Sequence, residues 1–264
     1  MIDVGRDLPA RAPARLLAGA HTMVLHEPAG QAGPEHAHPE WTIFLPLAGR
    51  IEWWTGRSPG GHAAGVIFPP QVSYRAGSTA GHIVVFIDPW YQSLGRGGGA
   101  AVSLDPRAAE HLRALWSAVD PADLDECGRE TVSYLRQRSL LSPAVRVDPR
   151  VVAALRDLPA AECVTHVAAD VGLSPSRLRA LVHDLTGTSP ARLRMWRRLR
   201  TAMIGLVDKP IALAASDAGF ADQAHLTRTA TRLIGQTPGD LARLLQAPRD
   251  RRHRDDVPAT ARVA

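Results

Sequence analysis

The last third of the chain reads Gly172-Leu173-Ser174-Pro175-Ser176-Arg177-Leu178 and, one helix later, Gly187-Thr188-Ser189-Pro190. The signature then recurs: Gly219-Phe220-Ala221-Asp222-Gln223-Ala224-His225-Leu226-Thr227-Arg228 is followed by Gly235-Gln236-Thr237-Pro238. Each copy consists of a glycine turn, a helix and Gly-x-[Ser/Thr]-Pro. The pattern predicts two helix–turn–helix units. Two such units joined by one helix can read successive major-groove faces of one DNA duplex.

The first unit carries the local signals of a sharp turn followed by a helix. Gly172 stands where the chain needs a positive φ. Ser174 can cap the next helix and Pro175 takes its first position. Apolar residues at helical spacing predict a buried stripe, so the opposite face is left to solvent. The outward face consists of Ser176, Arg177, Arg179, Ala180 and His183.

The second unit repeats this logic, with Gly219 at the turn and Asp222 as the cap. Its outward face consists of Gln223, Ala224, Thr227 and Arg228. The connecting helix, expected from about Pro190 to Val207, would be about 27 Å long at 1.5 Å per residue. That length is compatible with placing two recognition helices one DNA turn, roughly 34 Å, apart. Of the arginines on this helix, some are expected to reach phosphates and others to face solvent.

The charge of the chain is concentrated where the repeated motif lies. Residues 1–150 hold 14 Lys+Arg against 15 Asp+Glu, whereas residues 151–264 hold 17 against 11. Basic charge confined to the segment with the duplicated motif fits binding to phosphates. With 264 residues and 45% hydrophobic composition, the chain is long and apolar enough for two cores.

A larger set of positions follows one family pattern over about residues 150–245. These positions are Val167-Ala168, Gly172-Leu173-Ser174-Pro175, Leu178, Gly187-x-Ser189-Pro190, Arg198, Ala202, Ile211, Ala215, Gly219-Phe220-x-Asp222-Gln223-x-His225-Leu226-x-Arg228 and Gly235-x-Thr237-Pro238. In them the sequence closely resembles the AraC family of bacterial transcription regulators. The resemblance implies DNA contacts by Ser176, Arg179, Ala180, Gln223, Ala224, Thr227 and Arg228. It favours activation over repression.

The chain departs from that family where large aromatic residues are usual. Leu226, Ala230 and Leu233 stand there instead, so the second unit is expected to pack less tightly and to bind with less specificity.

Residues 16–90 predict an antiparallel sandwich or small barrel. Short β-branched and aromatic runs are separated by turn residues, as in all-β domains. The expected turns include Gly56–Gly61 and Gly77–Gly81. The expected strands are His21–Glu27, Trp41–Leu47, Arg50–Thr55, Gly65–Phe68 and His82–Asp88. Gly33-x-x-His36-x-His38, the loop before Gly49 and the segment Gly65–Pro70 resemble a cupin barrel, the sensor domain common in AraC-type regulators.

The histidines of this region raise the question of an effector pocket or a metal centre. A metal-dependent cupin would add a glutamate and a later histidine, but Thr42 and Tyr74 stand at those positions. Glu40 shares a strand face with His36 and His38 and could substitute. We predict no metal or other cofactor and a pocket for a small effector. Its predicted residues are His36, His38, Glu40, Trp53, Tyr74 and His82.

The predicted fold is α+β and multi-domain: a cupin-like β-barrel, a helical linker and an all-α domain with two helix–turn–helix motifs. The predicted boundaries are 1–98 for the sensor domain, 99–148 for the linker, 149–246 for the DNA-binding domain and 247–264 for a basic disordered tail. Gly95–Ala101 is expected to be a flexible linker. Helices are expected over Pro106–Val119 and Pro121–Arg138, either as a dimer surface or packed on the barrel.

Two cysteines without metal-ligand spacing, Cys127 and Cys163, indicate a reducing compartment. No signal peptide or membrane span is expected, so the protein is predicted to be cytoplasmic. The expected partners are double-stranded DNA and a small effector, while RNA polymerase and a second copy of the chain remain open. Two rival functions also remain open: a cupin metalloenzyme with an appended DNA-binding-like domain, and an architectural DNA binder without effector control.

Overall fold

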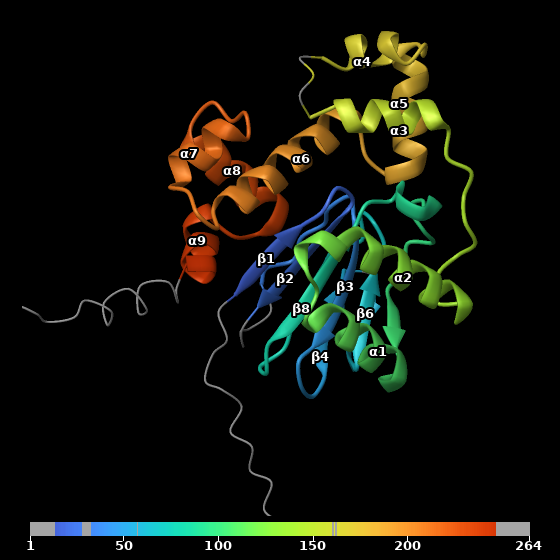
Figure 1. Ribbon diagram of the computed structural model, residues 1–264, viewed down its shortest axis with the longest axis vertical. Helices are drawn as coiled ribbons and strands as arrows, with labels where there is room; N and C mark the ends of the chain where they lie inside the picture. Colours follow the sequence, from blue (N-terminus) through green and yellow to red (C-terminus); the bar gives the residue numbers. More distant parts are fainter. Residues whose placement is uncertain (1–13, 28–32, 57, 160, 162, 247–264) are drawn as a thin grey trace, which may run out of the picture.

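The computed structural model describes residues 14–27, 33–56, 58–159, 161 and 163–246. Within them, strands form the N-terminal part and helices the C-terminal part, as Figure 1 shows. The α+β fold class is therefore confirmed. The predicted tail, 247–264, and the N-terminal segment 1–13 lie outside the described residues.

The N-terminal part contains two antiparallel sheets. The larger has the order β1-β2-β8-β3-β6-β9 and the smaller the order β5-β4-β7. In chain order, the strands are β1 (Arg15–Ala18), β2 (Thr22–Glu27), β3 (Trp41–Pro46), β4 (Ile51–Thr55), β5 (Ser58–Ala63), β6 (Gly65–Phe68), β7 (Tyr74–Gly77), β8 (His82–Ile87) and β9 (Val102–Leu104). All five expected strands are present to within a residue at each end.

The central strands β3 and β8 are buried along their whole length because both of their faces are covered. Phe44, Val84 and Phe86 point into the barrel core, and their neighbours Ile43 and Val85 point into a second core under the helices. This alternation follows from the two-residue period of a strand.

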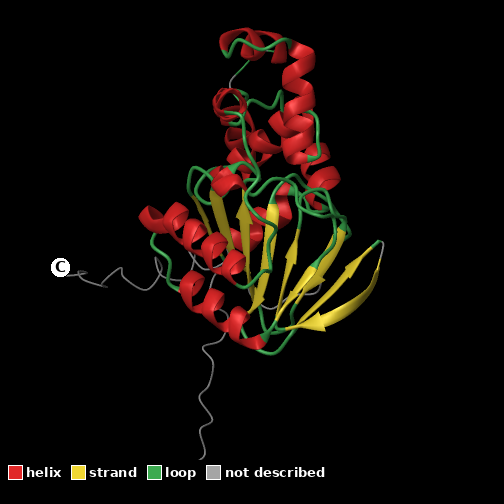
Figure 2. Ribbon diagram, turned by 90° about the vertical axis from the view of Figure 1, so that its right-hand side faces the viewer, coloured by secondary structure: helices red, strands yellow, loops and turns green. Residues whose placement is uncertain are grey.

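The second core is closed by α1 (Pro106–Ser117) and α2 (Leu124–Gln137), with the short helices η1 (Tyr91–Ser93) and η2 (Pro121–Asp123) nearby. Figure 2 shows both helices lying against the larger sheet. Asp105 caps α1 by accepting from the Ala108 N–H, and the indole of Trp116 donates to Thr131 Oγ1 at 2.9 Å. The apolar faces of the expected helical pair therefore pack on the barrel.

Two glycine-rich stretches differ from their expected roles. Gly56–Gly61, expected to be a turn, contains much of β5, where a Cβ at Gly60 would lie 2.1 Å from the Trp53 carbonyl oxygen. Gly95–Ala101, expected to be a flexible linker, lies against the barrel: a Cβ at Gly97 would lie 2.6 Å from the Trp41 ring. Glycine is needed in both stretches for close backbone approach. The following strand β9 extends the larger sheet beyond residue 98.

The C-terminal part is helical and contains the two predicted helix–turn–helix units. Its elements are α3 (Pro149–Asp157), α4 (Val164–Asp170), α5 (Pro175–Thr186), α6 (Pro190–Gly205), α7 (Ile211–Asp217), α8 (Gln223–Ile234) and α9 (Pro238–Gln246). In Figure 1, α6 runs between the two units and above the barrel. None of the helices in the described ranges is long and apolar enough to cross a bilayer.

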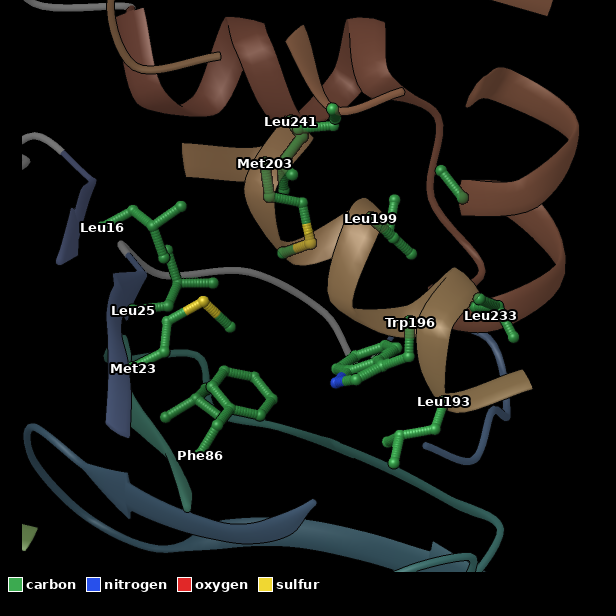
Figure 3. Close-up of a cluster of buried hydrophobic side chains, with 14 of the residues drawn as sticks. Leu16, Met23, Leu25, Phe86, Leu193, Trp196, Leu199, Met203, Leu233 and Leu241 are labelled. Carbon is green, nitrogen blue, oxygen red and sulfur yellow. The ribbon is translucent and has the colours of Figure 1, made fainter. Parts of the chain in front are cut away.

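The barrel and the helical part share one hydrophobic cluster. Figure 3 shows Met23, Leu25 and Phe86 of the barrel on one side and Trp196 and Met203 of α6 on the other. Because burial of apolar surface stabilises contact roughly in proportion to area, the connecting helix is held by the barrel as well as by its own domain.

Candidate nucleic-acid interface

The first unit has the turn that its sequence predicts. Gly172 adopts φ of 66°, and the Ser174 hydroxyl accepts a hydrogen bond from the Arg177 N–H at 3.2 Å. Leu178 and Val182 are buried, which orients α5 with its apolar stripe inward. The predicted contact residues Ser176, Arg177, Arg179, Ala180 and His183 are all exposed.

The second unit is built in the same way. Gly219 adopts φ of 76°, and Asp222 caps α8 by accepting from the His225 N–H at 2.6 Å. Gln223, Ala224 and Arg228 are exposed. Thr227 is half-buried and its hydroxyl donates to the Gln223 carbonyl at 2.9 Å.

The small residues on the inner face of α8 are fully buried. Leu226, Ala230 and Leu233 pack towards α6. A cavity of about 10 Å³ remains between α6, α8 and α9, with Leu226 and Ala230 in its wall. The residues that line this small cavity are all apolar.

The turn at Gly219 supports a stability prediction. Gly219→Val places a β-branched residue at positive φ, which should lower the free energy of unfolding by about 1–3 kcal/mol. Thermal melting of the purified protein measures the loss. Ala212→Val, on the exposed face of α7, is the control and should change stability far less. Equal melting temperatures for the two variants would contradict the prediction.

The arginines of α6 are placed by tertiary contacts that the sequence analysis missed. Arg194 donates to the Ala161 carbonyl at 3.0 Å and Arg198 to the Gly219 carbonyl at 3.3 Å. Arg197 and Arg200 turn towards the barrel. Only Arg192 of these five lies on the exposed surface. Some of these arginines were expected to reach phosphates. Four of the five side chains instead contact other parts of the protein, so the expectation now applies best to Arg192.

The contact of α6 with the barrel includes a buried ionic cluster. Arg200 is 5% exposed and its Nη1 lies 2.9 Å from Glu40 Oε1, which is on a side chain 1% exposed. Nη2 of Arg200 donates to the Thr22 carbonyl at 2.6 Å. Asp88, fully buried, lies 3.6 Å from Arg200 Nη1 and 2.9 Å from Arg197 Nη1.

Burial and the charges of neighbouring side chains shift the pKa values of Glu40 and Arg200 in opposite directions. Desolvation raises the pKa of Glu40, and the Arg200 guanidinium opposes that rise. Burial acts to lower the pKa of Arg200, but the carboxylates of Glu40 and Asp88 outweigh it and raise the pKa. Arg200 therefore stays charged in a site with little water. Removing it would leave two carboxylates buried beside each other.

Three predicted effector-pocket residues, His36, His38 and Tyr74, lie together, and His38 contacts α6. The His38 ring stacks on Trp196 of α6, with centroids 4.7 Å apart and planes at 13°. Desolvation, followed by the charge of His36, holds the pKa of His38 well below its usual value. The neutral ring can therefore accept at Nε2 from the Tyr74 hydroxyl, 2.9 Å away. His36 packs against Tyr74 at a centroid distance of 4.8 Å.

The other three predicted pocket residues are dispersed. Glu40 faces Arg200 across the domain contact. His82 lies 3.2 Å from Glu27 Oε2 and packs near Phe44. Trp53 is half-buried against Phe68. Among the described residues, no group of three or more His, Cys, Asp or Glu side chains is arranged to hold a metal ion.

The barrel also touches the C-terminal end of each recognition helix. A Cβ at Gly187, which ends α5, would lie 3.0 Å from Gln71 Cγ. A Cβ at Gly235, which ends α8, would lie 2.3 Å from Pro34 Cγ. The loops carrying Pro34 and Gln71 are joined to each other by paired hydrogen bonds between His36 and Tyr74. One structural unit of the barrel therefore contacts both helix–turn–helix units.

Comparisons with known proteins agree with the overall fold. Residues 167–244 match the family model described as a helix–turn–helix domain. Similar solved structures include an apo form of a ToxT variant from Vibrio cholerae, with a TM-score of 0.61, 10% identity and coverage of 87% of this chain and 99% of that one. Wild-type Vibrio cholerae ToxT with an unsaturated fatty acid bound has a TM-score of 0.60 and 11% identity, over 90% and 99% of the two chains. A search of curated proteins finds no match.

Proposed function

We propose that this chain, a DNA-binding transcription regulator with an AraC-type helix–turn–helix domain, reads a promoter site with α5 and α8 under the control of a small effector bound by its barrel. The observation that carries the proposal is that the barrel contacts one set of helix surfaces and leaves another set exposed. The outward faces of α5 and α8 stay free, whereas the barrel holds the ends of these helices and the inner face of α6.

The free faces offer the chemistry that base reading requires. Neither Arg179 nor Arg228 forms an ion pair or side-chain hydrogen bond with the described residues. A free guanidinium can donate to guanine O6 and N7, and an amide such as Gln223 can pair with adenine. Ala180 and Ala224 allow contact with a thymine methyl group.

Effector control would act through the contact between the two domains. An effector shifts an equilibrium only by binding one arrangement better than the other. The stacked and hydrogen-bonded residues His38, Tyr74 and Trp196 lie where the barrel meets α6, so a ligand that rearranges them changes how both recognition helices are presented. ToxT, which has the same fold, has been solved with an unsaturated fatty acid bound.

The proposal extends to activation and assembly. An activator needs RNA polymerase as a partner at the promoter. A second copy of the chain, paired through the outer surface of α1 and α2, would place two DNA-binding domains on one promoter.

The test is selection of random DNA fragments by the purified full chain, with and without candidate metabolites, followed by sequencing of the retained DNA. We expect an enriched motif with two half-elements about one helical turn apart and retention that a metabolite changes. Retention of all sequences equally at fixed salt would overturn sequence-specific regulation and favour an architectural binder.

The arginines at the centre of the two faces supply a binding prediction. Arg179→Ala or Arg228→Ala should cost about 1–3 kcal/mol of binding free energy at the selected site and relax the base preference there. Electrophoretic titrations on the selected site and on random DNA measure both effects. Arg50→Ala, at an exposed position of the barrel directly before β4, is the control and should bind both like the wild type. Equal losses on specific and random DNA would show that the arginine touches only phosphates.

A further inference from the structure

We propose that the barrel makes a DNA contact of its own: Arg96 binds a backbone phosphate of the duplex beside the C-terminal end of α5. Arg96 lies in the glycine-rich segment between β8 and β9, outside the helix–turn–helix domain. The inference rests on the proposed function, since it takes the outward face of α5 as the face that meets DNA. It assigns DNA contact to a residue that the helix–turn–helix pattern does not include.

The outward face of α5 ends at a position without a side chain. Ser176, Ala180 and His183 follow one another on this face at helical spacing, and all three are exposed. Positions 176 and 187 are 11 residues apart, which is about three turns of helix, so the same line along the helix surface ends at Gly187. Gly187 has φ of 72° and cannot extend the face. A DNA contact at this end therefore has to come from another segment.

The side chain of Arg96 lies beside this position. Its Cδ is 4.0 Å from the place that a Cβ on Gly187 would take. Arg96, His183 and Gly187 also line one hollow of about 830 Å³ between the barrel and α5. Arg96 is exposed. The barrel therefore places a cation next to the last turn of the outward face.

The backbone on both sides of Arg96 is held in place. The Gly95 N–H donates to the Pro89 carbonyl at 2.7 Å, and the Gly95 carbonyl accepts from the Trp41 indole at 2.7 Å. Gly95 and Gly97 have φ of 66° and 70°, which glycine adopts without strain. Gly97 lies against the Trp41 ring. A backbone that is already ordered lowers the entropy lost when the arginine binds a partner.

The Arg96 side chain is available to an anion. It forms no ion pair or hydrogen bond with the described residues. A neighbouring hollow of about 580 Å³ is lined by Arg96 together with Asp148 and Asp184. Asp148 is paired with Arg150 at 2.8 Å, and Asp184 lies beyond ion-pair distance of Arg96. The paired N–H donors of a guanidinium match the oxygens of a phosphate, so a DNA phosphate supplies a partner that the described part of the protein does not.

The length of α5 favours a phosphate over a base as that partner. A recognition helix enters the major groove with its N-terminal residues, and the groove is about 12 Å wide. At 1.5 Å per residue, position 187 lies about 16 Å beyond Ser176. A residue beside position 187 therefore meets the sugar–phosphate edge of the groove. Such a contact adds affinity without selecting a sequence.

Titration of the full chain with DNA at several salt concentrations tests the contact. Loss of one phosphate contact changes the slope of log K against log salt by about 0.9. We expect Arg96→Gln to weaken binding to the selected site and to random DNA by a similar factor, about threefold or more in about 50 mM salt. The ratio of wild-type to variant affinity should fall about threefold between about 50 and 200 mM salt. Unchanged affinity and slope overturn the proposal, and so does tighter binding by the variant, which would show that the barrel obstructs DNA.

Two further variants control for charge and folding. Arg50→Gln removes the same charge from an exposed barrel position that lines neither hollow, so affinity and slope should stay as in the wild type. Arg96→Lys keeps a cation and should keep the slope, because an ammonium also binds phosphate. Arg96 is exposed, so Arg96→Gln should fold, which circular dichroism checks. Equal effects of Arg96→Gln and Arg50→Gln would mean that only the net charge of the barrel matters, and would overturn the contact.

A neutral linkage in the DNA locates the phosphate. Single methylphosphonates, in which a methyl group replaces a charged phosphate oxygen, are placed in turn along the flank of each half-element of the selected site. At one position the replacement should weaken binding of the wild type but not of Arg96→Gln, because the variant has already lost that contact. Equal losses in the two proteins at every position would rule out a direct contact.

These outcomes separate the inference from the function on which it rests. If the wild-type chain binds no DNA, both fail. If it binds all sequences equally, sequence-specific regulation fails, while the Arg96 contact is still measured on random DNA. If it selects a motif and Arg96→Gln binds like the wild type, the barrel contact alone fails.

Discussion

Arg200→Met is expected to lower the free energy of unfolding by about 3–5 kcal/mol, the range measured when one partner of a buried ion pair is removed. The reason is electrostatic. Glu40 and Asp88 are almost without solvent exposure, and Arg200 lies against both of them. Without the guanidinium, the charge of Glu40 is left unpaired in a site where water cannot solvate it, and Asp88 keeps only Arg197 as its arginine partner. The Thr22 carbonyl keeps one donor, the Gly19 N–H, and loses the other.

Urea titration, followed by tryptophan fluorescence and circular dichroism, measures the loss. Trp196, one of six tryptophans in the chain, lies beside the cluster and stacks on His38, so part of the fluorescence change reports the domain contact. We expect the fluorescence transition to move to lower urea before the transition of the barrel, because the contact between α6 and the barrel weakens first.

Two further variants make the result specific. Arg192→Met removes an exposed arginine from the same helix and should change stability by less than about 0.5 kcal/mol. Glu40→Leu combined with Arg200→Met should recover part of the loss, because an apolar pair can replace a buried ionic one, while Arg197 still pairs with Asp88. If Arg200→Met is as stable as Arg192→Met, the cluster does not hold the domains together.

Gly235→Ala is expected to lower the free energy of unfolding by about 2–4 kcal/mol. Part of this, about 1–2 kcal/mol, is the strain of a Cβ at φ of 69°. The rest arises because that Cβ would lie 2.3 Å from Pro34 Cγ, so the barrel loop or α8 must move. Thermal and urea unfolding measure the total.

Gly172 offers a matched control for the strain alone. It has φ of 66° and nothing lies within 4 Å of the position of its Cβ. Gly172→Ala should therefore lose only the strain contribution. Pro34→Ala removes the ring atoms that clash, so adding it to Gly235→Ala should bring the loss close to that of Gly172→Ala. Equal losses for Gly235→Ala and Gly172→Ala would show that the barrel loop does not press on the end of α8.

The local parts of the DNA-binding domain could be predicted because their causes are local. Ser174 and Asp222 cap the recognition helices, and Gly172 and Gly219 have the positive φ expected of them. Each of these features needs only a few neighbouring residues, since a cap or a left-handed turn is satisfied within one helical turn. The strands of the barrel could be predicted for a similar reason, because short β-branched and aromatic runs between turn residues are visible in the sequence.

The residues that face another domain could not be assigned in this way. Arg200 and Arg192 look alike as arginines on one basic helix, yet Arg200 is buried and Arg192 is exposed. Helical spacing tells which residues share a face, but not whether the face meets solvent, phosphate or a second domain. In the same way, His38 and Glu40 were predicted on one face of the barrel, and the structure shows that this face meets Trp196 and Arg200.

The amino-acid sequence by itself determined the repeated helix–turn–helix units, their caps and turns, their outward residues and the β-rich character of the N-terminal part. Only the tertiary structure decided which arginines remain exposed, and which glycines, such as Gly187 and Gly235, lie against loops of the barrel. The physical reason is the separation along the chain of the residues that interact. Hydrogen bonds in turns, and the spacing of residues on one face of a helix or strand, involve residues only a few positions apart. The ion pairs and close contacts between barrel and helices join residues such as Glu40 and Arg200, whose meeting depends on how the whole chain packs.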